Sequence, residues 1–395
     1  MSVCVMLVAA EASGDALGAD LIAALRRRLG PDTRFVGLGG PAMRAEGVAS
    51  PFDISELSVV GLLEGLLAVR RAARRADQLA ALAERERPDV AVLIDSWGFS
   101  YLTAERLRRR LPGLPLVKYV LPQVWASRPR RARAAARLFD LLLSIVAFEA
   151  PLFEREGGKV VFVGHPAATR SFAGADPGRL RARIGAGPDD PILLVLPGSR
   201  ASEIERLMPP FEDAVRRLKA GRPSLQVVLV AAPTVAPAVK ARLSGWPVQP
   251  HLIEDAEGKD DAMSAAAVAL ACSGTVTTEL AAAGCPMVVA YRLGAVTYQI
   301  ARRIVRTRYI TLFNIAADAP VAPELIQDAC NGPALARELA LRLDDPALRA
   351  RQAAAQTAAL RTLGLGGEPP AERAAQAIAQ MIRPASADRP PRPRQ

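Results

Sequence analysis

The feature that most constrains the fold of this chain is a regular alternation of short apolar runs with longer segments of helical periodicity. Between the runs, apolar residues recur at helical spacing, as at Leu17, Leu21 and Leu25. Strands that alternate with helices pair in parallel and are covered by those helices. We therefore expect an α/β protein. The apolar runs cover residues 3–9, 34–38, 90–94, 116–120, 141–146, 160–163, 192–196, 226–230, 268–271 and 287–290.

The alternation is interrupted once, at residues 167–191, which are rich in Gly, Pro, Ala and Asp. The 395 residues are enough for two domains of ordinary size. We predict two Rossmann-like parallel-sheet domains that face a cleft. The first covers residues 1–166, the linker covers 167–191, and the second covers 192–382 and includes the C-terminal helices. The Pro- and Arg-rich tail, 383–395, is predicted to be disordered.

The net charge of +11, from 51 Lys and Arg against 40 Asp and Glu, favours an anionic partner. Nucleic acid, anionic lipid and phosphorylated substrates all fit this charge, and so does ordinary solvated surface charge. Aromatic residues make up 5% of the chain, which argues against a surface that stacks on exposed nucleobases.

The four cysteines are isolated, and neither histidine lies at metal-ligand spacing, so we predict no metal site. Isolated cysteines suit a reducing cytosol. The N-terminus reads as a strand rather than a signal peptide, and no apolar run reaches the ~20 residues needed to cross a membrane. These features predict a soluble or peripheral protein.

The turn at residues 196–205 follows an apolar run and leads into a helix. Gly198 allows a ligand to approach the backbone closely, and the N–H groups of the helix favour an anion. Arg200 adds a charge with bidentate geometry suited to phosphate. Ser202 and Glu205 have the spacing of a capping box. An ordinary turn with a surface arginine explains the same residues.

A second turn of this kind, at residues 271–279, follows the run 268–271. Ser273, Gly274 and Thr275 supply hydroxyls and backbone donors at a helix start. The Glu279 carboxylate is positioned about one turn into the helix, where it can accept hydrogen bonds from ribose hydroxyls. A capped helix with a solvated glutamate is the plainer alternative. Two anion-type turns in one domain favour a nucleotide diphosphate.

The first turn of the chain, residues 10–15, carries two carboxylates, Glu11 and Asp15, at the end of the first predicted strand. Carboxylates at this place suit hydroxyl binding or general-base catalysis. Stabilisation of a helix N-terminus by Asp15 is an equally good explanation.

The segment 57–75 is apolar first and carries two arginine pairs later, which suits an interfacial segment on anionic lipid. A core helix with a basic end is the alternative, and it is favoured when the segment is taken alone. A second basic stretch, 128–137, suits a phosphate or lipid site or a solvated face. The candidate lipid-facing residues are Val59, Val60, Leu62, Leu63, Leu66, Leu67, Arg70, Arg71, Arg74 and Arg75.

Taken in order, these motifs resemble the lipid-A-disaccharide synthases, a family of GT-B-fold glycosyltransferases, from about residue 3 to about residue 380. Each motif is weak alone, but their order and spacing are specific. The matching stretches are AEASGDALG at 10–18, GLGGPAM at 37–43, LSVVGLLE at 57–64, PDVAVLID at 88–95, YVLPQVW at 119–125, FVGHP at 162–166, LPGSR at 196–200 with Glu203, and SGTVTTE at 273–279.

The resemblance implies transfer of a diacylglucosamine unit from its UDP form onto diacylglucosamine 1-phosphate, with inversion, release of UDP and no metal or cofactor. It implies a cytoplasmic enzyme that is peripheral on the inner membrane, with no nucleic-acid partner. The lipid reading of 57–75 is then favoured over the core helix. The C-terminal domain would bind UDP through Gly198, Ser199, Arg200, Glu203, Ser273, Gly274, Thr275, Glu279 and Asn314.

The chain departs from the family pattern at two places. The family usually has IDAPDFN after the strand 90–94, with the second carboxylate proposed as catalytic, whereas this chain has IDSWGFS at 94–100. Gly98 cannot take a proton, so we assign the base to Asp95, with Glu11 as the alternative. Asn314 is retained from the motif LPNLLAGR, but its later arginine is not. We expect His165 to shape the domain junction.

Two other functions remain open from the sequence. One is another UDP-sugar enzyme of the same fold, such as an epimerase, which has no need of a lipid-facing segment. The other is a basic scaffold without catalysis that binds anionic membrane or nucleic acid. Such a scaffold predicts binding with a steep salt dependence and no UDP pocket.

Overall fold

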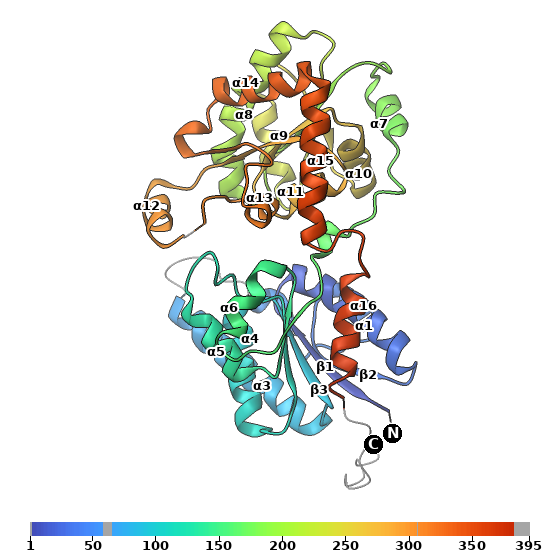
Figure 1. Ribbon diagram of the computed structural model, residues 1–395, viewed down its shortest axis with the longest axis vertical. Coiled ribbons are helices and arrows are strands. Elements are labelled where there is room, and N and C mark those ends of the chain that lie inside the picture. The colour runs from blue at the N-terminus through green and yellow to red at the C-terminus, as the bar shows by residue number, and fades with distance from the viewer. Residues whose placement is uncertain (1, 58–64, 306, 383–395) are drawn as a thin grey trace. The chain divides into compact units, whose positions relative to one another are not determined.

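The computed structural model describes residues 2–57, 65–305 and 307–382, with the backbone alone at residues 65–68. The chain divides into two compact units (Figure 1). The first combines the chain up to Gly164 with the segment that begins at Glu368, and the second is His165–Gly367. Among the described residues, no helix is long and apolar enough to span a membrane.

The first unit is built on a parallel sheet with the strand order β2-β1-β3-β4-β5-β6. Because the chain winds outward from β1 in both directions, the order reverses between β1 and β3. In open parallel sheets, ligands bind beyond the carboxyl ends of the strands at such a switch point. The strands are β1 (Cys4–Ala9), β2 (Arg34–Leu38), β3 (Val90–Ile94), β4 (Leu116–Tyr119), β5 (Leu141–Ser144) and β6 (Val160–Phe162).

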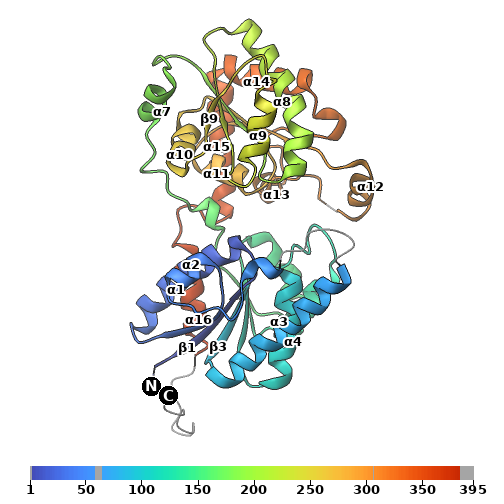
Figure 2. The ribbon, with the colours of Figure 1, turned by 180° about the vertical axis from the view of Figure 1, so that it is seen from behind.

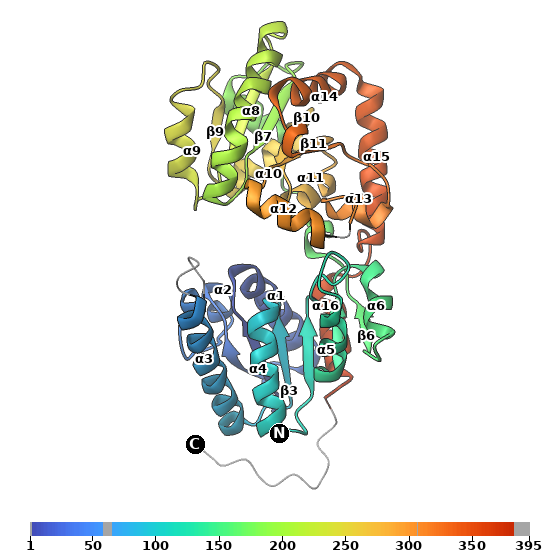
Figure 3. The same cartoon turned by 90° about the vertical axis from the view of Figure 1, so that its left-hand side faces the viewer.

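Helices cover both faces of this sheet because its strands are apolar on both sides (Figures 2 and 3). One face packs on α1 (Ala12–Leu29) and α16 (Pro370–Ala379). The other packs on α3 (Gly65–Glu86), α4 (Trp97–Arg110) and α5 (Arg130–Leu138). The shorter helices are α2 (Pro41–Ala45) and α6 (Ala150–Glu154), with 3-10 turns at Ile54–Leu57 and Ala147–Glu149.

The second unit repeats this plan with the parallel strand order β12-β11-β10-β7-β8-β9. Its order reverses between β7 and β10, which are the strands that precede the two predicted anion turns. The strands are β7 (Ile192–Leu196), β8 (Gln226–Val230), β9 (His251–Ile253), β10 (Val268–Cys272), β11 (Met287–Tyr291) and β12 (Glu324–Ile326).

The helices of the second unit include α8, α9 and α14, which share one apolar core with the sheet. The described residues of this unit form α7 (Pro177–Ile184), α8 (Ala201–Gly221), α9 (Ala236–Leu243), α10 (Ala256–Ala265), α11 (Thr275–Ala282), α12 (Ala295–Ile304), α13 (Leu312–Ala317), α14 (Gly332–Asp344) and α15 (Pro346–Thr362). Single 3-10 turns lie at Pro166–Ala168 and Gln327–Ala329.

The α/β class with two parallel sheets is confirmed, and two details of the predicted domain plan differ. The last helix, α16, belongs to the first unit, because Ala374, Ala375 and Ile378 are buried in the core beneath α1. The predicted linker contains α7, which packs on α10. Arg179 of α7 holds the Asp261 carboxylate of α10 at 2.6 and 2.7 Å. Residues 167–191 are therefore part of the second unit.

Candidate active site

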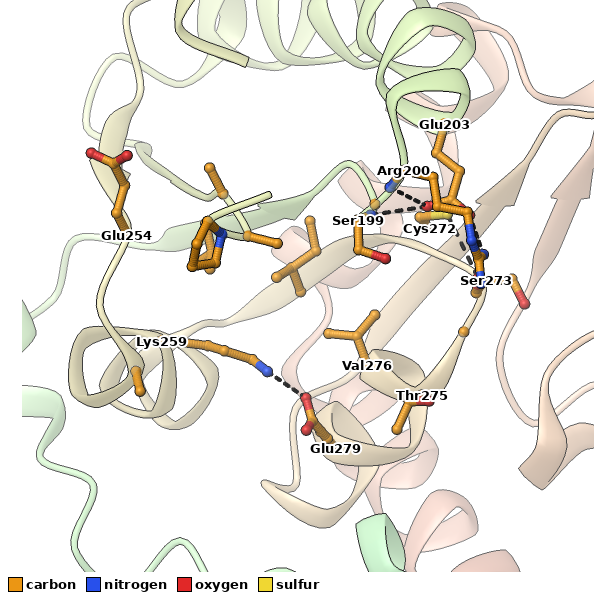
Figure 4. A pocket seen from close by; sticks show the side chains of 18 of the residues that line it. Ser199, Arg200, Glu203, Glu254, Lys259, Cys272, Ser273, Thr275, Val276 and Glu279 are labelled. Atoms are coloured by element: carbon orange, nitrogen blue, oxygen red, sulfur yellow. Dashed lines mark hydrogen bonds and ion pairs between the residues drawn. The ribbon is translucent and has the colours of Figure 1, made fainter. Parts of the chain in front are cut away.

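The second unit contains a pocket of about 500 Å³ at the carboxyl ends of its central strands (Figure 4). The turns after β7 and β10, which are neighbours at the switch point, form one side of it. Residues after β8 and β9, including Pro233 and Glu254, line the rest. Of the predicted nucleotide residues, all but Asn314 line this pocket: Gly198, Ser199, Arg200, Glu203, Ser273, Gly274, Thr275 and Glu279.

The turn after β7 is shaped by Glu203, a buried carboxylate in the first turn of α8. One Glu203 oxygen accepts hydrogen bonds from the N–H groups of Ser199 and Arg200, at 2.9 and 3.2 Å. Gly198 has a φ of +120°, and a Cβ there would lie 2.5 Å from a Glu203 oxygen. Glycine is therefore required by both the backbone conformation and the close approach of Glu203.

This arrangement corrects the predicted capping box of Ser202 and Glu205. The helix begins two residues earlier than that pairing needs, so Arg200 is the N-cap and Glu203 is the capping carboxylate. Glu203 thus holds the backbone of the turn, and it occupies two of the N–H groups that would otherwise face a ligand. No described residue accepts a hydrogen bond from the next two N–H groups, those of Ala201 and Ser202.

Arg200 is the exposed cation of this turn. Its side chain is 75% exposed, and one guanidinium nitrogen lies 2.8 Å from the second Glu203 oxygen. That hydrogen bond raises the pKa of Arg200. The ion pair offsets the charge of the buried Glu203, and the other guanidinium nitrogens remain able to contact an anion in the pocket.

The turn after β10 brings small polar residues to the start of α11. Gly274 is the N-cap, and the Thr277 hydroxyl donates to its carbonyl at 2.8 Å. The Ser273 hydroxyl donates to the Ile310 carbonyl at 3.4 Å. Within the described chain, the N–H groups of Thr275 and Val276 have no acceptor. The starts of α8 and α11 thus both border one pocket, and helix N-termini carry partial positive charge.

Glu279 lies deeper in the pocket wall, between two cations that the sequence prediction missed. Its carboxylate lies 2.6 Å from the Lys259 Nζ and 3.0 Å from the Arg170 Nη1 (Figure 4 shows the Lys259 pair). The other terminal nitrogen of Arg170, Nη2, donates to both carboxylate oxygens of Asp260, at 2.7 Å each. Glu279 therefore lines the pocket as predicted, and it belongs to a network of ion pairs with Lys259, Arg170 and Asp260.

Asn314 does not line the pocket and instead supports the loop between α13 and β12. It is fully buried, and its amide bonds both backbone groups of Ala322 and a Glu324 oxygen, at 2.8 to 3.0 Å. Glu324 also accepts hydrogen bonds from the N–H groups of Ile310 and Thr311. Because its amide is already engaged in these bonds, Asn314 is a structural residue rather than a nucleotide ligand.

In the first unit, Asp15 is also structural. Its carboxylate is buried and accepts three backbone hydrogen bonds, from Gly40, Ala42 and Met43, at 2.7 to 3.0 Å. These are the free N–H groups at the start of α2. The carboxylate predicted as catalytic therefore fixes the GLGGPAM turn to α1.

Asp95 and Glu11 both lie at the switch point of the first sheet. Asp95 follows β3, and Glu11 follows the neighbouring strand β1. Asp95 is partly exposed, and its carboxylate accepts a hydrogen bond from the Ser13 hydroxyl at 3.1 Å. Glu11 is exposed at the N-cap of α1. Asp95 and Ser96 both have positive φ, 51° and 35°, which is costly for residues with a Cβ.

The support for this strained turn is Lys118, a fully buried residue of β4. Its Nζ donates to the Asp95 carbonyl and lies 3.3 Å from the Leu93 carbonyl. It also lies 3.1 Å from the Ser100 hydroxyl, which itself donates to the Asp95 carbonyl at 2.7 Å. Burial lowers the Lys118 pKa to about 7, and the charges of Asp95 and Glu11 oppose that shift.

Gly98 lies in the first turn of α4 and is exposed. A Cβ added there meets no atom within 4 Å. Glycine is therefore not required at this position by packing, and a carboxylate would fit sterically where the family pattern has one.

The candidate lipid segment 57–75 is described only in part. Val59, Val60, Leu62 and Leu63 lie outside the described residues, as do the side chains of Leu66 and Leu67. Arg70, Arg71 and Arg74 are exposed on α3. Arg75 is different, because it forms an ion pair with Glu56 and lies 4.6 Å over the Phe52 ring. It attaches α3 to the preceding turn.

The basic stretch 128–137 and His165, both noted in the sequence, have structural explanations. The basic stretch 128–137 forms α5, whose Ala132 and Ala135 are buried while most of its arginines are exposed. His165 caps the 3-10 turn Pro166–Ala168, with its Nδ1 accepting from the Ala167 N–H at 3.2 Å. Burial lowers its pKa to about 4. Among the described residues, no group of three or more His, Cys, Asp or Glu could hold a metal ion.

Glu149 is a buried carboxyl after β5 that the sequence analysis did not single out. Burial raises its pKa to about 8 from an ordinary 4.5, although the Ser144 hydroxyl donates to it at 2.7 Å. Between these values the unfolded chain releases the proton and the folded chain keeps it, so Glu149 lowers stability progressively as pH rises from 4.5 to about 8.

We therefore expect Glu149→Gln to raise the free energy of unfolding at pH 7.5 by roughly 1–3 kcal/mol, because a neutral amide can still accept from Ser144 without losing hydration of a charge. Urea unfolding at pH 5 and pH 7.5 measures this. The gain should shrink at pH 5. An equal effect at both pH values would mean that titration of Glu149 is not its cause.

Comparison with known proteins connects this geometry to a family. A sequence profile described as lipid-A-disaccharide synthetase matches residues 5–381. The lipid-A-disaccharide synthase of Paramagnetospirillum magneticum is 42% identical over 387 residues, 98% of this chain and 99% of its own length. The enzyme of the same name from Rhodospirillum centenum is 41% identical, over 92% of this chain and 90% of its own length.

Solved structures of low sequence identity share the fold. A co-structure of Staphylococcus aureus MnaA with UDP has a TM-score of 0.64 at 15% identity, covering 97% of this chain and 96% of that protein. The calicheamicin glycosyltransferase CalG4 has a TM-score of 0.60 at 19% identity, covering 96% and 98%. Structures named as UDP-N-acetylglucosamine 2-epimerases also match, one with a TM-score of 0.61 at 14% identity, so epimerases and glycosyltransferases share this architecture.

Proposed function

The chain belongs to the lipid-A-disaccharide synthase family, and we propose that it joins two acylated glucosamine units. It is a glycosyltransferase with the GT-B fold. The proposed donor is UDP-2,3-diacylglucosamine and the proposed acceptor is 2,3-diacylglucosamine 1-phosphate. The products are the β-1,6-linked disaccharide 1-phosphate and UDP.

The proposed donor site rests on one observation. The starts of α8 and α11, together with Arg200, border the same pocket. We propose that the UDP diphosphate binds the N–H groups of Ala201, Ser202, Thr275 and Val276, with Arg200 alongside. Glu279, held by Lys259 and Arg170, can accept hydrogen bonds from the ribose hydroxyls. These groups are oriented before substrate arrives, so no reorganisation is needed as the diphosphate leaves.

The proposed reaction is a single displacement with inversion at the anomeric carbon. The acceptor 6-hydroxyl attacks, its proton passes to a base, and the bond to UDP breaks. We propose Asp95 as that base, because its carboxylate is partly exposed at a switch point and its backbone is clamped by Lys118. We also propose that no metal is needed, so that turnover is unchanged in excess EDTA.

The acyl chains of both substrates favour a peripheral place on the cytoplasmic face of the inner membrane. The exposed Arg70, Arg71 and Arg74 of α3 support this, together with Val69, which is 59% exposed beside them. Arginines next to exposed apolar side chains suit an anionic lipid surface. Arg75 is excluded from this surface by its ion pair with Glu56.

A UDP-sugar epimerase and a basic scaffold without catalysis are the alternatives that need a test. Saturable thermal stabilisation by UDP supports a nucleotide site, and its absence favours the scaffold. Conversion of UDP-N-acetylglucosamine to a second UDP-sugar, without consumption of a lipid acceptor, would favour the epimerase. The family result weighs against both alternatives.

We expect Lys118→Met to lower kcat by about tenfold to a hundredfold without changing the KM for the UDP donor. Methionine keeps the length of the chain but removes the N–H donors that hold the Asp95 carbonyl. Steady-state kinetics of the folded variant measure the split between kcat and KM.

The matched control is Lys219→Met in the second unit. Lys219 also donates to two backbone carbonyls, those of Pro223 and Leu225, at 2.7 and 2.6 Å. Its replacement should leave kcat unchanged. If both variants lose activity equally, or if Lys118→Met only shifts the thermal midpoint, Lys118 does not position Asp95.

A further inference from the structure

The helix α12 leaves apolar side chains unpartnered on the surface of the second unit. Among the described residues, six large apolar side chains are exposed, and four of these lie on α12 or directly after it. Val296 is 76% exposed, Ile300 55% and Ile304 47%, with Val305 following. No residue of α12 is buried. Figures 1 and 2 show the helix set apart from the body of its unit.

These side chains form one continuous face. Val296, Ile300 and Ile304 are spaced by four residues, so they lie one above another along the helix. Tyr298 and Ala301, which are half-buried, lie on the other side of the helix. The helix therefore presents its aliphatic stripe to solvent, whereas the apolar stripe of an ordinary surface helix faces the core.

The segment of the sequence that contains α12 carries charge of one sign. Residues 280–317 contain five arginines, Arg292, Arg302, Arg303, Arg306 and Arg308, and no Asp or Glu. Arg302 and Arg303 are exposed in the last turn of α12. None of the ion pairs between described residues involves either of them. Arg303 donates instead to the Gln299 carbonyl at 2.6 Å, within the same helix.

We propose that α12 is a second lipid-contacting element, which lays its Val296–Ile300–Ile304 stripe on an anionic bilayer surface while Arg302 and Arg303 meet the lipid phosphates. An aliphatic stripe bordered by arginines, without acidic residues, is the chemistry of an interfacial helix. The inference deepens the proposed function, which brings acylated substrates to this protein, but its observations come from α12 alone.

The test reads the environment of single positions on the full-length chain. The four native cysteines are buried, so a cysteine introduced at the surface is labelled selectively. Ile300→Cys reports on the stripe. Leu341→Cys on α14 is the matched control, because Leu341 is 51% exposed and isolated from α12 in the sequence. Each variant carries an environment-sensitive nitrobenzoxadiazole label, and vesicles contain either phosphatidylglycerol with phosphatidylcholine or phosphatidylcholine alone.

We expect the label at position 300 to shift to shorter wavelength on the anionic vesicles, less on the neutral ones, and back in high salt. The label at position 341 should not shift. In the unlabelled chain, Ile300→Asp should weaken vesicle binding by about tenfold or more, since one aliphatic side chain no longer leaves water.

Two results would overturn the inference. If the protein sediments with anionic vesicles while the label at position 300 stays in water, another segment carries the membrane contact and the proposed function is untouched. If the label shifts without vesicles as protein concentration rises, the stripe binds a second copy. The opposite combination is also informative. If the label at position 300 shifts on vesicles but the chain forms no disaccharide, the lipid contact of α12 is supported and the proposed reaction is wrong.

Discussion

Asp95→Asn is expected to lower kcat by about a hundredfold to ten-thousandfold while leaving UDP affinity unchanged. The amide has the shape of the carboxylate and can still accept from the Ser13 hydroxyl, so the turn between β3 and α4 should stay in place. It cannot take the proton of the acceptor hydroxyl. Single-turnover rates and UDP titration calorimetry separate the loss of chemistry from any loss of binding.

The control for this variant is Glu11→Gln at the same switch point. Glu11 is exposed and is the alternative base, so its amide tests whether any carboxylate near the crevice would do. Near-full turnover of Asp95→Asn together with loss of activity in Glu11→Gln would transfer the role to Glu11. Loss in both would indicate that the two carboxylates act together.

Gly98→Asp extends the same experiment. The substitution restores the carboxylate of the family pattern, and it meets no steric obstacle because no atom lies within 4 Å of the added Cβ. An aspartate in the first turn of α4 also favours the helix. If Asp95 is the base, the variant changes kcat little. A large gain in kcat, with rescue of Asp95→Asn, would show that the usual position is the better base.

Arg200→Met is expected to lower kcat/KM by about a hundredfold to a thousandfold. The variant removes the charge that we propose stabilises the departing diphosphate. It also leaves the buried Glu203 carboxylate without its ion-pair partner, so a negative charge next to the pocket is no longer offset. Arg200→Lys should recover part of the loss, because it restores the charge but not the bidentate geometry.

Arg206→Met is the matched control for Arg200. Arg206 lies further along the same helix, α8, outside the residues that line the pocket. Its replacement should leave UDP affinity within about twofold, whereas Arg200→Met should weaken it clearly. Equal UDP affinity in wild type and Arg200→Met would contradict the assignment of Arg200 to the diphosphate.

That the turns after β7 and β10 lie at a ligand-type position could be predicted because two local patterns coincided with a topological rule. An apolar run that ends in a glycine or serine turn before a helix indicates a strand end, and ligands bind at strand ends near a switch point. The sequence did not show which strands were neighbours. The structure places β7 beside β10, so the two turns share one pocket.

The site predictions for Asp15 and Asn314 differ from the structure for a common reason. In a sequence, a carboxylate or amide that hydrogen-bonds to the backbone cannot be distinguished from one that binds a substrate. Asp15 caps α2 and Asn314 holds the loop near Ala322, and both are buried. The edge strands β9 and β12 were missed because each has three residues and begins with a polar one, His251 or Glu324, whereas the equally short β6 is wholly apolar. Lys118 had a usable signal: a lysine inside an otherwise apolar strand needs acceptors nearby.

The most direct test of this account is product formation by the purified protein in detergent. The protein is incubated with UDP-2,3-diacylglucosamine and 2,3-diacylglucosamine 1-phosphate, and mass spectrometry follows the disaccharide 1-phosphate and UDP. Wild type is expected to form both products in equal amounts, and Asp95→Asn is expected to lose them. Tight UDP binding without any disaccharide would contradict it, and would mean that the chain with Gly98 has a different acceptor or has lost the transfer reaction.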